Sequence, residues 1–335
     1  LPWNFPFFLI ARKMAPALVT GNTIVVKPSV DSPINAVLFS EIVHQVGLPK
    51  GVFNVVHGSG GEIGYELSAN PKVGLVSLTG SEPAGRKVME AASQNITKVN
   101  LELGGKAPAI VFADADLDLA AKAIVASRVI NSGQVCNCAE RIYVQREVKE
   151  AFTEKLVELM KKVRFGDPLA DESLDMGPMV NLQGQQHAQK MVDETIKAGG
   201  KLLLGGKAVQ GKGHYFEPTV IADVSNDMAI LREEIFAPVI PVATFDTVDE
   251  VIQLANDCEY GLTSSVYTQN INKAMKVISR LKFGETYVNR ENFEAMQGFH
   301  AGWRKSGIGG ADGKHGLEEY LQTHVVYLQY DQEIN

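Results

Sequence analysis

The feature that most constrains the fold is a repeated alternation between short apolar runs and segments in which apolar residues recur at helical spacing. In the first third of the chain the apolar runs lie at 23–26, 52–56, 73–78 and 98–103. Helical segments are expected at 7–18, from 32 to about 47, shortly after 61, and from 81 to about 95. Strands that alternate with helices indicate a doubly wound parallel sheet, whose ligands bind at the carboxyl ends of the strands.

The alternation continues beyond Gly105 and predicts a second α/β domain. Its expected strands lie at 107–112, 141–145, 201–204, 238–245, 262–268 and 285–289. Its expected helices lie at 117–130, 147–162, 182–198, 248–256 and 271–281. A chain of 335 residues, 45% of them hydrophobic, is large enough to give two such domains full cores.

The last part of the chain has a different character. Residues 292–313 are rich in glycine and aromatic residues without clear periodicity, which predicts a long loop of the kind that is usually functional. Residues 324–329 then alternate as a strand near the terminus. Because this strand has no hairpin partner nearby, we expect it to pair with another subunit.

Composition excludes several classes of protein. The net charge of −7 argues against a nucleic-acid surface, and no apolar run approaches the ~18 residues of a membrane span. Three cysteines give no disulfide framework and suggest a reducing compartment, so we expect a cytoplasmic protein. The chain begins without Met inside an apparently structured segment, and we expect that N-terminal sequence is missing.

Two cysteines stand one residue apart after the helix predicted at 117–130. Cys136 follows Gly133 closely, and a thiol placed at the end of a helix is a candidate nucleophile. A buried structural cysteine is an equally good interpretation from the residues alone. A metal site is not supported, because Cys258 and the scattered histidines offer no second cluster at zinc spacing, and we expect no metal.

Glu102 is the best candidate for a general base. It stands between Leu101 and Leu103, just before a glycine pair, and burial between apolar neighbours would raise its pKa. The alternative is an ordinary strand residue whose side chain is solvated. Three further features could hold a phosphate or a ribose, each with an ordinary structural explanation: the glycines of 58–64, the turn Thr79-Gly80-Ser81, and Lys27.

Six motifs together resemble the NAD(P)-dependent aldehyde dehydrogenase superfamily, in order and over essentially the whole chain. They are PWNFP at 2–6, VVKPS at 25–29, LTGS at 78–81, LELGGK at 101–106, GQVC at 133–136 and EEIF at 233–236. The interval between Glu102 and Cys136 also resembles the family's interval between base and nucleophile.

The resemblance implies a role for each matching residue. Cys136 is expected to attack the aldehyde, with the Asn4 side chain and the Cys136 amide holding the oxyanion. Glu102 is expected to activate the water that hydrolyses the thioester. The residues expected at the cofactor are Lys27, Ser29, Gly80, Ser81, Leu103, Glu234 and Phe236.

The resemblance also implies a domain organisation. We expect a partial cofactor-binding domain at 1–101, a catalytic domain at 102–290, and a substrate and active-site loop at 291–314. A C-terminal helix and oligomerisation strand are expected at 315–335, in an assembly of two or four identical subunits.

Three departures from the family pattern bear on specificity. Val30, followed by Asp31, replaces the glutamate that many NAD-using members carry after KPS, so NAD is expected and NADP is possible. Ala237 replaces a glycine after EEIF. The usual substrate-tunnel aromatics are replaced by polar residues, namely Arg12, Glu294 and His300.

A tunnel lined by these three polar residues favours a short aldehyde that carries a hydroxyl, such as lactaldehyde or glycolaldehyde, because an alkyl chain would leave buried polar groups unpaired. Two alternatives remain open. One is another short aldehyde such as succinate semialdehyde, whose carboxylate Arg12 would bind. The other is an inactive fragment with a binding or structural role. Without the resemblance, Arg12 would be interpreted as a surface charge.

Overall fold

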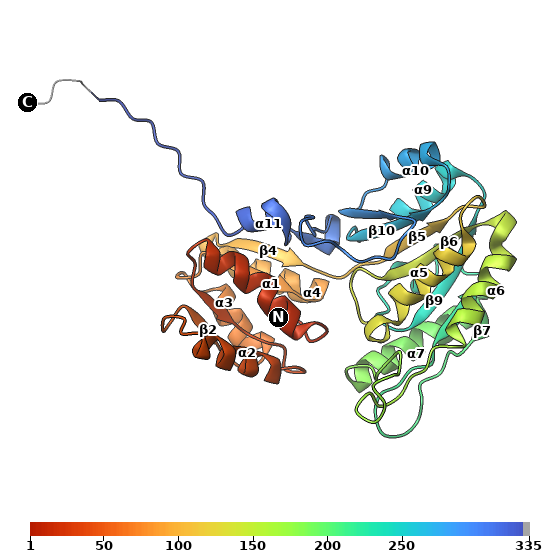
Figure 1. The fold of residues 1–335 in the computed structure, drawn as a ribbon, viewed down its shortest axis with the longest axis horizontal. Helices are drawn as coiled ribbons and strands as arrows, with labels where there is room; N and C mark the ends of the chain where they lie inside the picture. The colour runs from red at the N-terminus through yellow and green to blue at the C-terminus, as the bar shows by residue number, and fades with distance from the viewer. Residues whose placement is uncertain (331–335) are drawn as a thin grey trace, which may run out of the picture.

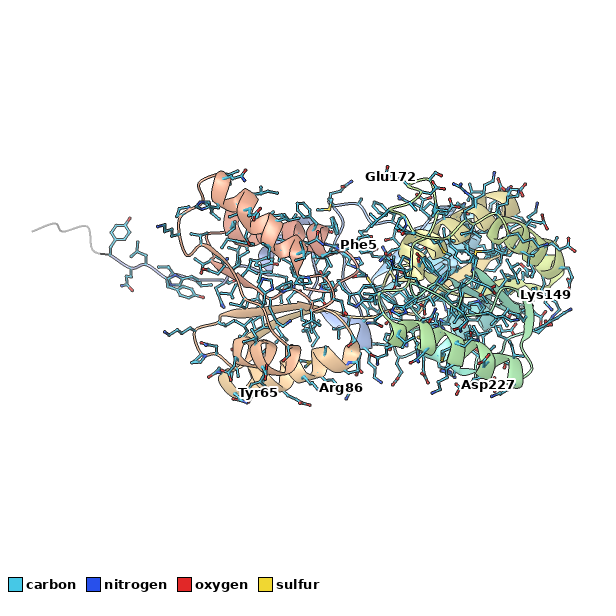
Figure 2. The ribbon with its side chains drawn as sticks, turned by 90° about the horizontal axis from the view of Figure 1, so that it is seen from below. Phe5, Tyr65, Arg86, Lys149, Glu172 and Asp227 are labelled. Carbon is cyan, nitrogen blue, oxygen red and sulfur yellow. The ribbon has the colours of Figure 1, made fainter. Side chains whose placement is uncertain are left out.

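Two groups of helices and strands lie side by side in the computed structural model, which describes residues 1–330 (Figure 1). The first group contains α1 (Pro6–Val19), β1 (Ile24–Val26), α2 (Ile34–Gln45), β2 (Phe53–Val55), α3 (Tyr65–Ser68), β3 (Leu75–Thr79), α4 (Glu82–Ala92) and β4 (Lys98–Glu102). Phe5, at the start of α1, lies where the two groups face each other (Figure 2).

The second group is built on a larger sheet. Its strands are β5 (Ala107–Val111), β6 (Ala139–Gln145), β7 (Lys201–Leu204), β8 (Thr219–Ala222), β9 (Val239–Phe245), β10 (Thr263–Tyr267) and β11 (Glu285–Val288). Its helices are α5 (Leu117–Val129), α6 (Lys149–Met160), α7 (Leu182–Lys197), α8 (Ala229–Arg232), α9 (Val248–Asn256) and α10 (Ile271–Ile278).

The strands of this sheet run in the order β11-β10-β5-β6-β9-β8-β7, and every pair is parallel except β7 with β8. All five residues of β5 are buried, because helices cover the sheet on both faces. On one face α5 and α6 pack against alternate residues of β5 and β6, such as Ala109 and Ile142. On the other face α7, α9 and α10 pack against the residues between them, such as Ile110 and Tyr143. This part of the chain is therefore α/β, as expected.

The first group is α/β as expected, but it is not one parallel sheet. In the described part of the chain β1 pairs only with β2, while β3 and β4 form a separate sheet with β12 (Gly307–Ile308), which is antiparallel to β4. The fold is thus α/β with parallel-rich mixed sheets. β12 was not predicted because two residues inside a long glycine-rich loop carry no periodic signal, and its partner strand lies far away in the sequence.

Most predicted elements occur within a few residues of their expected bounds. β8 and α8 were missed, because both are four residues long and lie between glycine, proline and charged residues. The helix expected near 315 is present as α11 (Gly313–Glu318). Residues 322–330 form no ladder within this chain and extend away from the body beyond α11, so the expected pairing of 324–329 with another subunit stays a prediction (Figure 1). Residues 331–335 lie outside the described residues.

Among residues 1–330, no helix combines the length and the apolar character that crossing a bilayer requires. The cysteines at 136, 138 and 258 are all free thiols, in keeping with the absence of a disulfide framework from the sequence.

Candidate active site

The turn that carries Cys136 has an unusual backbone. Asn131 and Ser132, which are not glycines, have φ values of 47° and 57°, and Gly133 continues in the left-handed region with φ 76°. Such conformations persist only where surrounding contacts hold them. Here the Ser132 hydroxyl donates to the Gly177 carbonyl at 2.7 Å, and Gln134 Oε1 accepts from the Val180 amide at 2.8 Å. The turn is therefore fixed from outside by a segment about 45 residues further along the chain.

The glycine pair of the LELGGK motif lets three segments meet. A Cβ atom at Gly105 would lie 2.4 Å from the carbonyl oxygen of Cys136. A Cβ atom at Gly104 would lie 2.5 Å from Glu234 Oε2. Only glycine allows backbone and side chains to approach so closely. The pair thus brings the end of β4, the cysteine turn and the EEIF motif together.

The two neighbouring cysteines have different surroundings. Cys136 is partly exposed, whereas Cys138 is 1% exposed. Arg128 Nη1 donates to the Cys138 sulfur at 2.8 Å, and the Cys138 thiol donates to the Val135 carbonyl at 2.8 Å. Burial raises the pKa of the Cys138 thiol to about 12, although the Arg128 charge opposes the shift. Cys138 is therefore a protonated, inaccessible thiol at neutral pH.

Glu102, at the end of β4, is 5% exposed and lies among positive charges. Its Oε2 accepts from the Thr79 hydroxyl at 2.7 Å and lies 3.8 Å from Lys13 Nζ. Its Oε1 is buried without a hydrogen-bond partner among the described residues, which leaves an open acceptor.

The expected rise in the pKa of Glu102 is wrong. Burial alone would raise this pKa, but the charges of Lys13, Arg12 and His300, together with the Thr79 hydrogen bond, outweigh burial and hold it below its usual value. The sequence suggested burial from the flanking leucines, but the basic residues come from other elements. Glu102 is ionised at neutral pH and is in the form that accepts a proton.

Asn4 lies beside the cysteine turn, as the expected oxyanion role requires. Its Nδ2 donates to the Gln134 carbonyl at 3.0 Å, and its own carbonyl accepts from Asn131 Nδ2 at 3.3 Å. The PWNFP and GQVC motifs are therefore in direct contact, although about 130 residues separate them.

Two of the three polar residues expected in the substrate tunnel, Arg12 and Glu294, belong to one network. Arg12 is 7% exposed, so it is not the surface charge that its local sequence suggested. It forms ion pairs with Asp312 and with Glu294, the latter at 3.4 Å. The other oxygen of Glu294 accepts from Asn137 Nδ2 at 2.6 Å. Arg12 is thus connected through Glu294 to the residue that follows Cys136.

His300, also in the long loop, lies against Glu285. It is 3% exposed, and its Nδ1 is 2.6 Å from Glu285 Oε1. Burial would lower the pKa of this imidazole, but the hydrogen bonds with Cys136 and Glu285 outweigh burial and raise it well above its usual value. His300 is therefore an imidazolium at neutral pH.

Several residues expected at the cofactor present unused polar groups. Ser81 is the N-cap of α4 in an extended conformation, yet its hydroxyl does not cap the helix. Within residues 1–330 the Lys27 ammonium donates only to the Pro28 carbonyl, at 2.9 Å, and burial lowers its pKa. Open space surrounds Gly60 and Gly61, where an added Cβ would meet nothing within 4 Å. A hydroxyl at a helix N-terminus fits a pyrophosphate, and a lysine ammonium fits a ribose or a phosphate.

The other expected cofactor residues have mainly structural contacts. The Ser29 hydroxyl accepts from the Asp31 amide at 3.2 Å. The Gly80 amide donates to the Glu102 carbonyl at 3.0 Å, which joins this turn to the base candidate. The Leu103 side chain lies against Gly85 of α4, where an added Cβ would be 2.7 Å from Leu103 Cδ1.

The EEIF motif is held by a carboxylate that sequence reasoning missed. The buried side chain of Glu140 accepts from the amides of Ile235 and Phe236 at 3.2 and 3.0 Å. Glu234 Oε1 in turn accepts from the Gly105 amide at 2.8 Å. Burial and the nearby Glu140 charge raise the pKa of Glu234, whereas Lys106 and Arg128 overcome burial to lower that of Glu140. The Phe236 ring packs edge-on against Trp3 at 5.7 Å between centroids.

The structure therefore adds residues that spacing did not reveal. They are Lys13, Asn137, Glu140, Glu285 and Asp312. Asn137 lies between the two cysteines and Lys13 follows Arg12, so proximity to named candidates was the only available signal. The others lie in segments without any motif.

Comparisons with known proteins agree on one family. Residues 1–326 match the model of the aldehyde dehydrogenase family. The chain is 63% identical over 329 residues to lactaldehyde dehydrogenase of Escherichia coli (strain K12), covering 98% of this chain and 69% of that protein. The crystal structure of lactaldehyde dehydrogenase from Escherichia coli has a TM-score of 0.97 at 64% identity, with the same coverage of 98% and 69%.

Two further solved structures are similar and contain a nicotinamide cofactor. One is 3,6-anhydro-L-galactose dehydrogenase in complex with NADP, with TM-score 0.93 and 46% identity over 96% of this chain and 68% of that chain. The other is betaine aldehyde dehydrogenase from Staphylococcus aureus in complex with NAD+, with TM-score 0.92 and 39% identity over 95% of this chain and 64% of that chain.

Proposed function

Because this chain belongs to the aldehyde dehydrogenase family, we propose that it oxidises a small hydroxy-aldehyde, such as lactaldehyde or glycolaldehyde, to the carboxylic acid. It is an oxidoreductase that acts on aldehydes. The proposal for the substrate rests on one observation: Arg12 and Glu294 form a polar network that reaches Asn137, next to Cys136, and the buried His300 lies on the same long loop as Glu294.

In the proposed reaction Cys136 is the nucleophile. Its sulfur bonds to the aldehyde carbon, and the carbonyl π electrons move to the oxygen, which the Asn4 amide and the Cys136 backbone amide stabilise. A bound nicotinamide ring supplies the acceptor for the hydride of that carbon. Glu102 then takes a proton from water at its unpartnered Oε1, and the resulting hydroxide attacks the Cys136 thioester and releases the acid.

The polar network supports a hydroxy-aldehyde over an alkyl aldehyde. A methylene chain against Glu294 or His300 would leave buried polar atoms without water or partners, at a cost of about 1–3 kcal/mol for each unsatisfied group. A hydroxyl on the carbon next to the aldehyde can donate to a carboxylate or accept from an imidazolium. Succinate semialdehyde is less favoured, because Arg12 already pairs with Asp312 and Glu294 and has little uncompensated charge to offer.

The expected cofactor is NAD, and NADP remains a second candidate. Val30 is 66% exposed and carries no carboxylate that would repel a 2′-phosphate. Solved relatives contain either NAD+ or NADP. We propose that Lys27, Ser29, Gly80 and Ser81 hold the ribose and pyrophosphate, and that Leu103, Glu234 and Phe236 hold the nicotinamide end.

The assembly is proposed to contain two or four identical subunits. The apolar side chains at the end of the chain are exposed, among them Val326 at 68%, Tyr327 at 94% and Leu328 at 79%. A strand from another subunit would cover them and pair their backbone groups. The division into a cofactor-binding part at 1–101, a catalytic part at 102–290, a loop at 291–314 and a terminal segment at 315–335 is proposed on the same family pattern.

Steady-state kinetics test the proposed substrate. We expect kcat/KM for lactaldehyde to exceed that for propanal by about tenfold or more, because propanal lacks only the hydroxyl. We also expect lactaldehyde to exceed succinate semialdehyde, and each should be measured with NAD and with NADP. Equal values for propanal and lactaldehyde would contradict the hydroxy-aldehyde assignment. Absence of hydride transfer with every aldehyde would favour an inactive fragment.

A further inference from the structure

We propose that Asp312 is a specificity-determining residue: together with Glu294 it overcompensates the charge of Arg12, so that the site beside Cys136 rejects aldehydes that carry a carboxylate. The inference rests on the proposed function and deepens it. The preference for a hydroxyl says which aldehyde is bound, and Asp312 adds a reason why anionic aldehydes are excluded. The three charged side chains come from α1 and from the two ends of the long loop.

The backbone of the long loop holds Asp312 in a fixed place. Asp312 has φ 67° and ψ 167°, a conformation that normally only glycine adopts. The loop pairs with itself on both sides of this residue. His300 and Ala311 exchange two backbone hydrogen bonds, at 2.8 and 2.9 Å, and the Gly313 amide donates to the Met296 carbonyl at 3.0 Å. The position of the carboxylate is therefore set by the pairing within the loop.

The Asp312 side chain contacts Arg12 and not its own helix. Asp312 is the N-cap of α11, where an aspartate usually accepts hydrogen bonds from the first amides, but it forms no such bond. It forms an ion pair with Arg12 instead, and both side chains are 3% exposed. A buried carboxylate that leaves its helix uncapped to meet a guanidinium indicates an electrostatic role.

Arg12 has no free pair of donors for a substrate carboxylate. Its Nη2 pairs with Asp312, and its Nη1 lies 3.4 Å from Glu294 Oε1. A carboxylate binds a guanidinium most strongly through two parallel hydrogen bonds, and each such pair of donors includes at least one Nη atom. Both Nη atoms are engaged, so only Nε, which is buried without a partner in the described part of the chain, is left.

The charges of this cluster do not cancel. One guanidinium, that of Arg12, lies between two carboxylates, which leaves one negative charge in excess. The neighbouring cations have partners of their own. Lys13 Nζ lies 3.8 Å from Glu102 Oε2, and His300 Nδ1 lies 2.6 Å from Glu285 Oε1. A buried excess charge is screened less by water and salt than a charge on the surface.

The anionic end of the cluster is the end that reaches the cysteine turn. The Glu294 side chain is 16% exposed, whereas those of Arg12 and Asp312 are 3% exposed. Glu294 Oε2 accepts from Asn137 Nδ2 at 2.6 Å, and Asn137 directly follows Cys136. An anion near Cys136 is therefore repelled by Glu294, because Asp312 already compensates part of the charge of Arg12.

Two alkylating reagents of different charge test the proposal without aldehyde or cofactor. The Cys136 sulfur displaces iodide from either reagent, but iodoacetate is an anion and iodoacetamide is neutral. Mass spectrometry of the Cys136 peptide gives both rates at pH 8, and their ratio cancels the thiolate fraction of Cys136. We expect a lower ratio of iodoacetate to iodoacetamide in the folded chain than in the chain unfolded by urea. Asp312→Asn should raise the ratio by about threefold or more, because it removes the excess charge and keeps the shape of the side chain.

Asp246→Asn is the matched control, since it also removes one carboxylate from an ion pair, here with Arg146. Asp246 follows the end of β9, whereas Cys136 precedes the start of β6, and the two strands are parallel neighbours. The control charge thus lies at the opposite edge of the sheet, and its loss should leave the ratio within about 1.5-fold.

The outcomes separate an electrostatic role from a structural one. Equal changes in both rates in Asp312→Asn would leave the ratio unchanged, show a structural role, and overturn the proposal. A ratio that rises as much in Asp246→Asn would overturn it, as would a Cys136 that reacts with neither reagent, because the cluster would then lie beside no accessible site.

Steady-state kinetics extend the comparison to aldehydes. Asp312→Asn should raise kcat/KM for succinate semialdehyde relative to lactaldehyde by about threefold or more, and a fall in this relative value would contradict the role of Asp312. The proposed function is tested separately. A chain that does not oxidise lactaldehyde, or that prefers propanal, contradicts the proposed function, whereas the alkylation ratio still decides the role of Asp312.

Discussion

Cys136 and Cys138 differ by two positions in the chain, and the fold gives them opposite chemistry. Cys136 is partly exposed and lies in a turn that contacts of Ser132 and Gln134 hold from outside. Cys138 is sealed between Arg128 and the Val135 carbonyl, and burial raises its pKa to about 12. The difference shows that surroundings, more than residue type, decide whether a thiol reacts or packs.

The buried residues around Cys138 also hold part of the proposed cofactor site in place. Arg128, which contacts Cys138, forms an ion pair with Glu140 at 3.0 Å. Glu140 then orients the amides of Ile235 and Phe236 in the EEIF motif. The buried cluster of Arg128, Cys138 and Glu140 thus positions the EEIF motif, which we expect to contact the cofactor.

The largest expected effect separates the two thiols directly. Cys136→Ser should lower kcat by about 10⁴-fold or more, because a serine hydroxyl beside the same groups is a far weaker nucleophile than a thiolate. Cys138→Ser should keep turnover within about threefold, since its sulfur is not accessible to substrate. Steady-state NADH formation measures both variants. Equal losses of kcat in the two variants would contradict the assignment of Cys136, and not Cys138, as the nucleophile.

The next effect separates attack by Cys136 from release of the product. Glu102→Gln should slow hydrolysis of the thioester by about 10²- to 10⁴-fold, the usual contribution of a general base. Pre-steady-state measurements should still show a burst of NADH, because attack and hydride transfer do not need Glu102. Thr79→Val, which removes only the hydrogen bond to Glu102 Oε2, is the control and should retain turnover. Absence of a hydrolysis defect in Glu102→Gln would remove it from the base role.

The third effect tests the cluster around Cys138. Arg128→Met should lower the free energy of unfolding by about 3–5 kcal/mol, because it removes one partner of a buried ion pair. Urea unfolding measures the loss. Arg146→Met is the matched control, because its pair with Asp246 is exposed and its loss should be much smaller. Similar losses in both variants would mean that the buried cluster contributes no more than a surface pair.

The smallest expected effect is the pH dependence that Cys138 adds to stability. In the unfolded chain this thiol ionises near pH ~8.5, whereas in the folded chain its pKa is about 12. Between these values the folded state keeps a proton that the unfolded state has lost, so stability falls as pH rises. Cys138→Ala should remove up to ~1.4 kcal/mol per pH unit of this decline between pH 9 and 10. Urea unfolding at pH 8, 9 and 10 measures the slope, and identical slopes would place Cys138 in contact with water.

Local sequence predicted most of the fold, because helices and buried strands leave a periodic signal. The bounds of α9 were predicted without error, and those of α1, β5 and α7 within two residues. The signal failed for β8 and β12, which are two to four residues long. At 324–329 alternation is present but this chain provides no strand to pair with, so the expected strand stays a prediction.

For the candidate site, sequence spacing and motif resemblance named Cys136, Glu102 and Asn4, and the glycine pair at 104–105 explains in retrospect why the segments of Glu102 and Cys136 can meet. What the sequence by itself determined is therefore which elements form and which side chains are available for chemistry. Only the tertiary structure decided the protonation of those side chains: it gave Glu102 a lowered pKa, His300 a raised one and Cys138 a thiol that stays protonated. The physical reason is that periodicity is a property of neighbours in the chain, whereas electrostatic interaction depends on distance in space and on burial. Lys13 and Glu285 shift the pKa values of Glu102 and His300 from elements that local sequence does not connect to them.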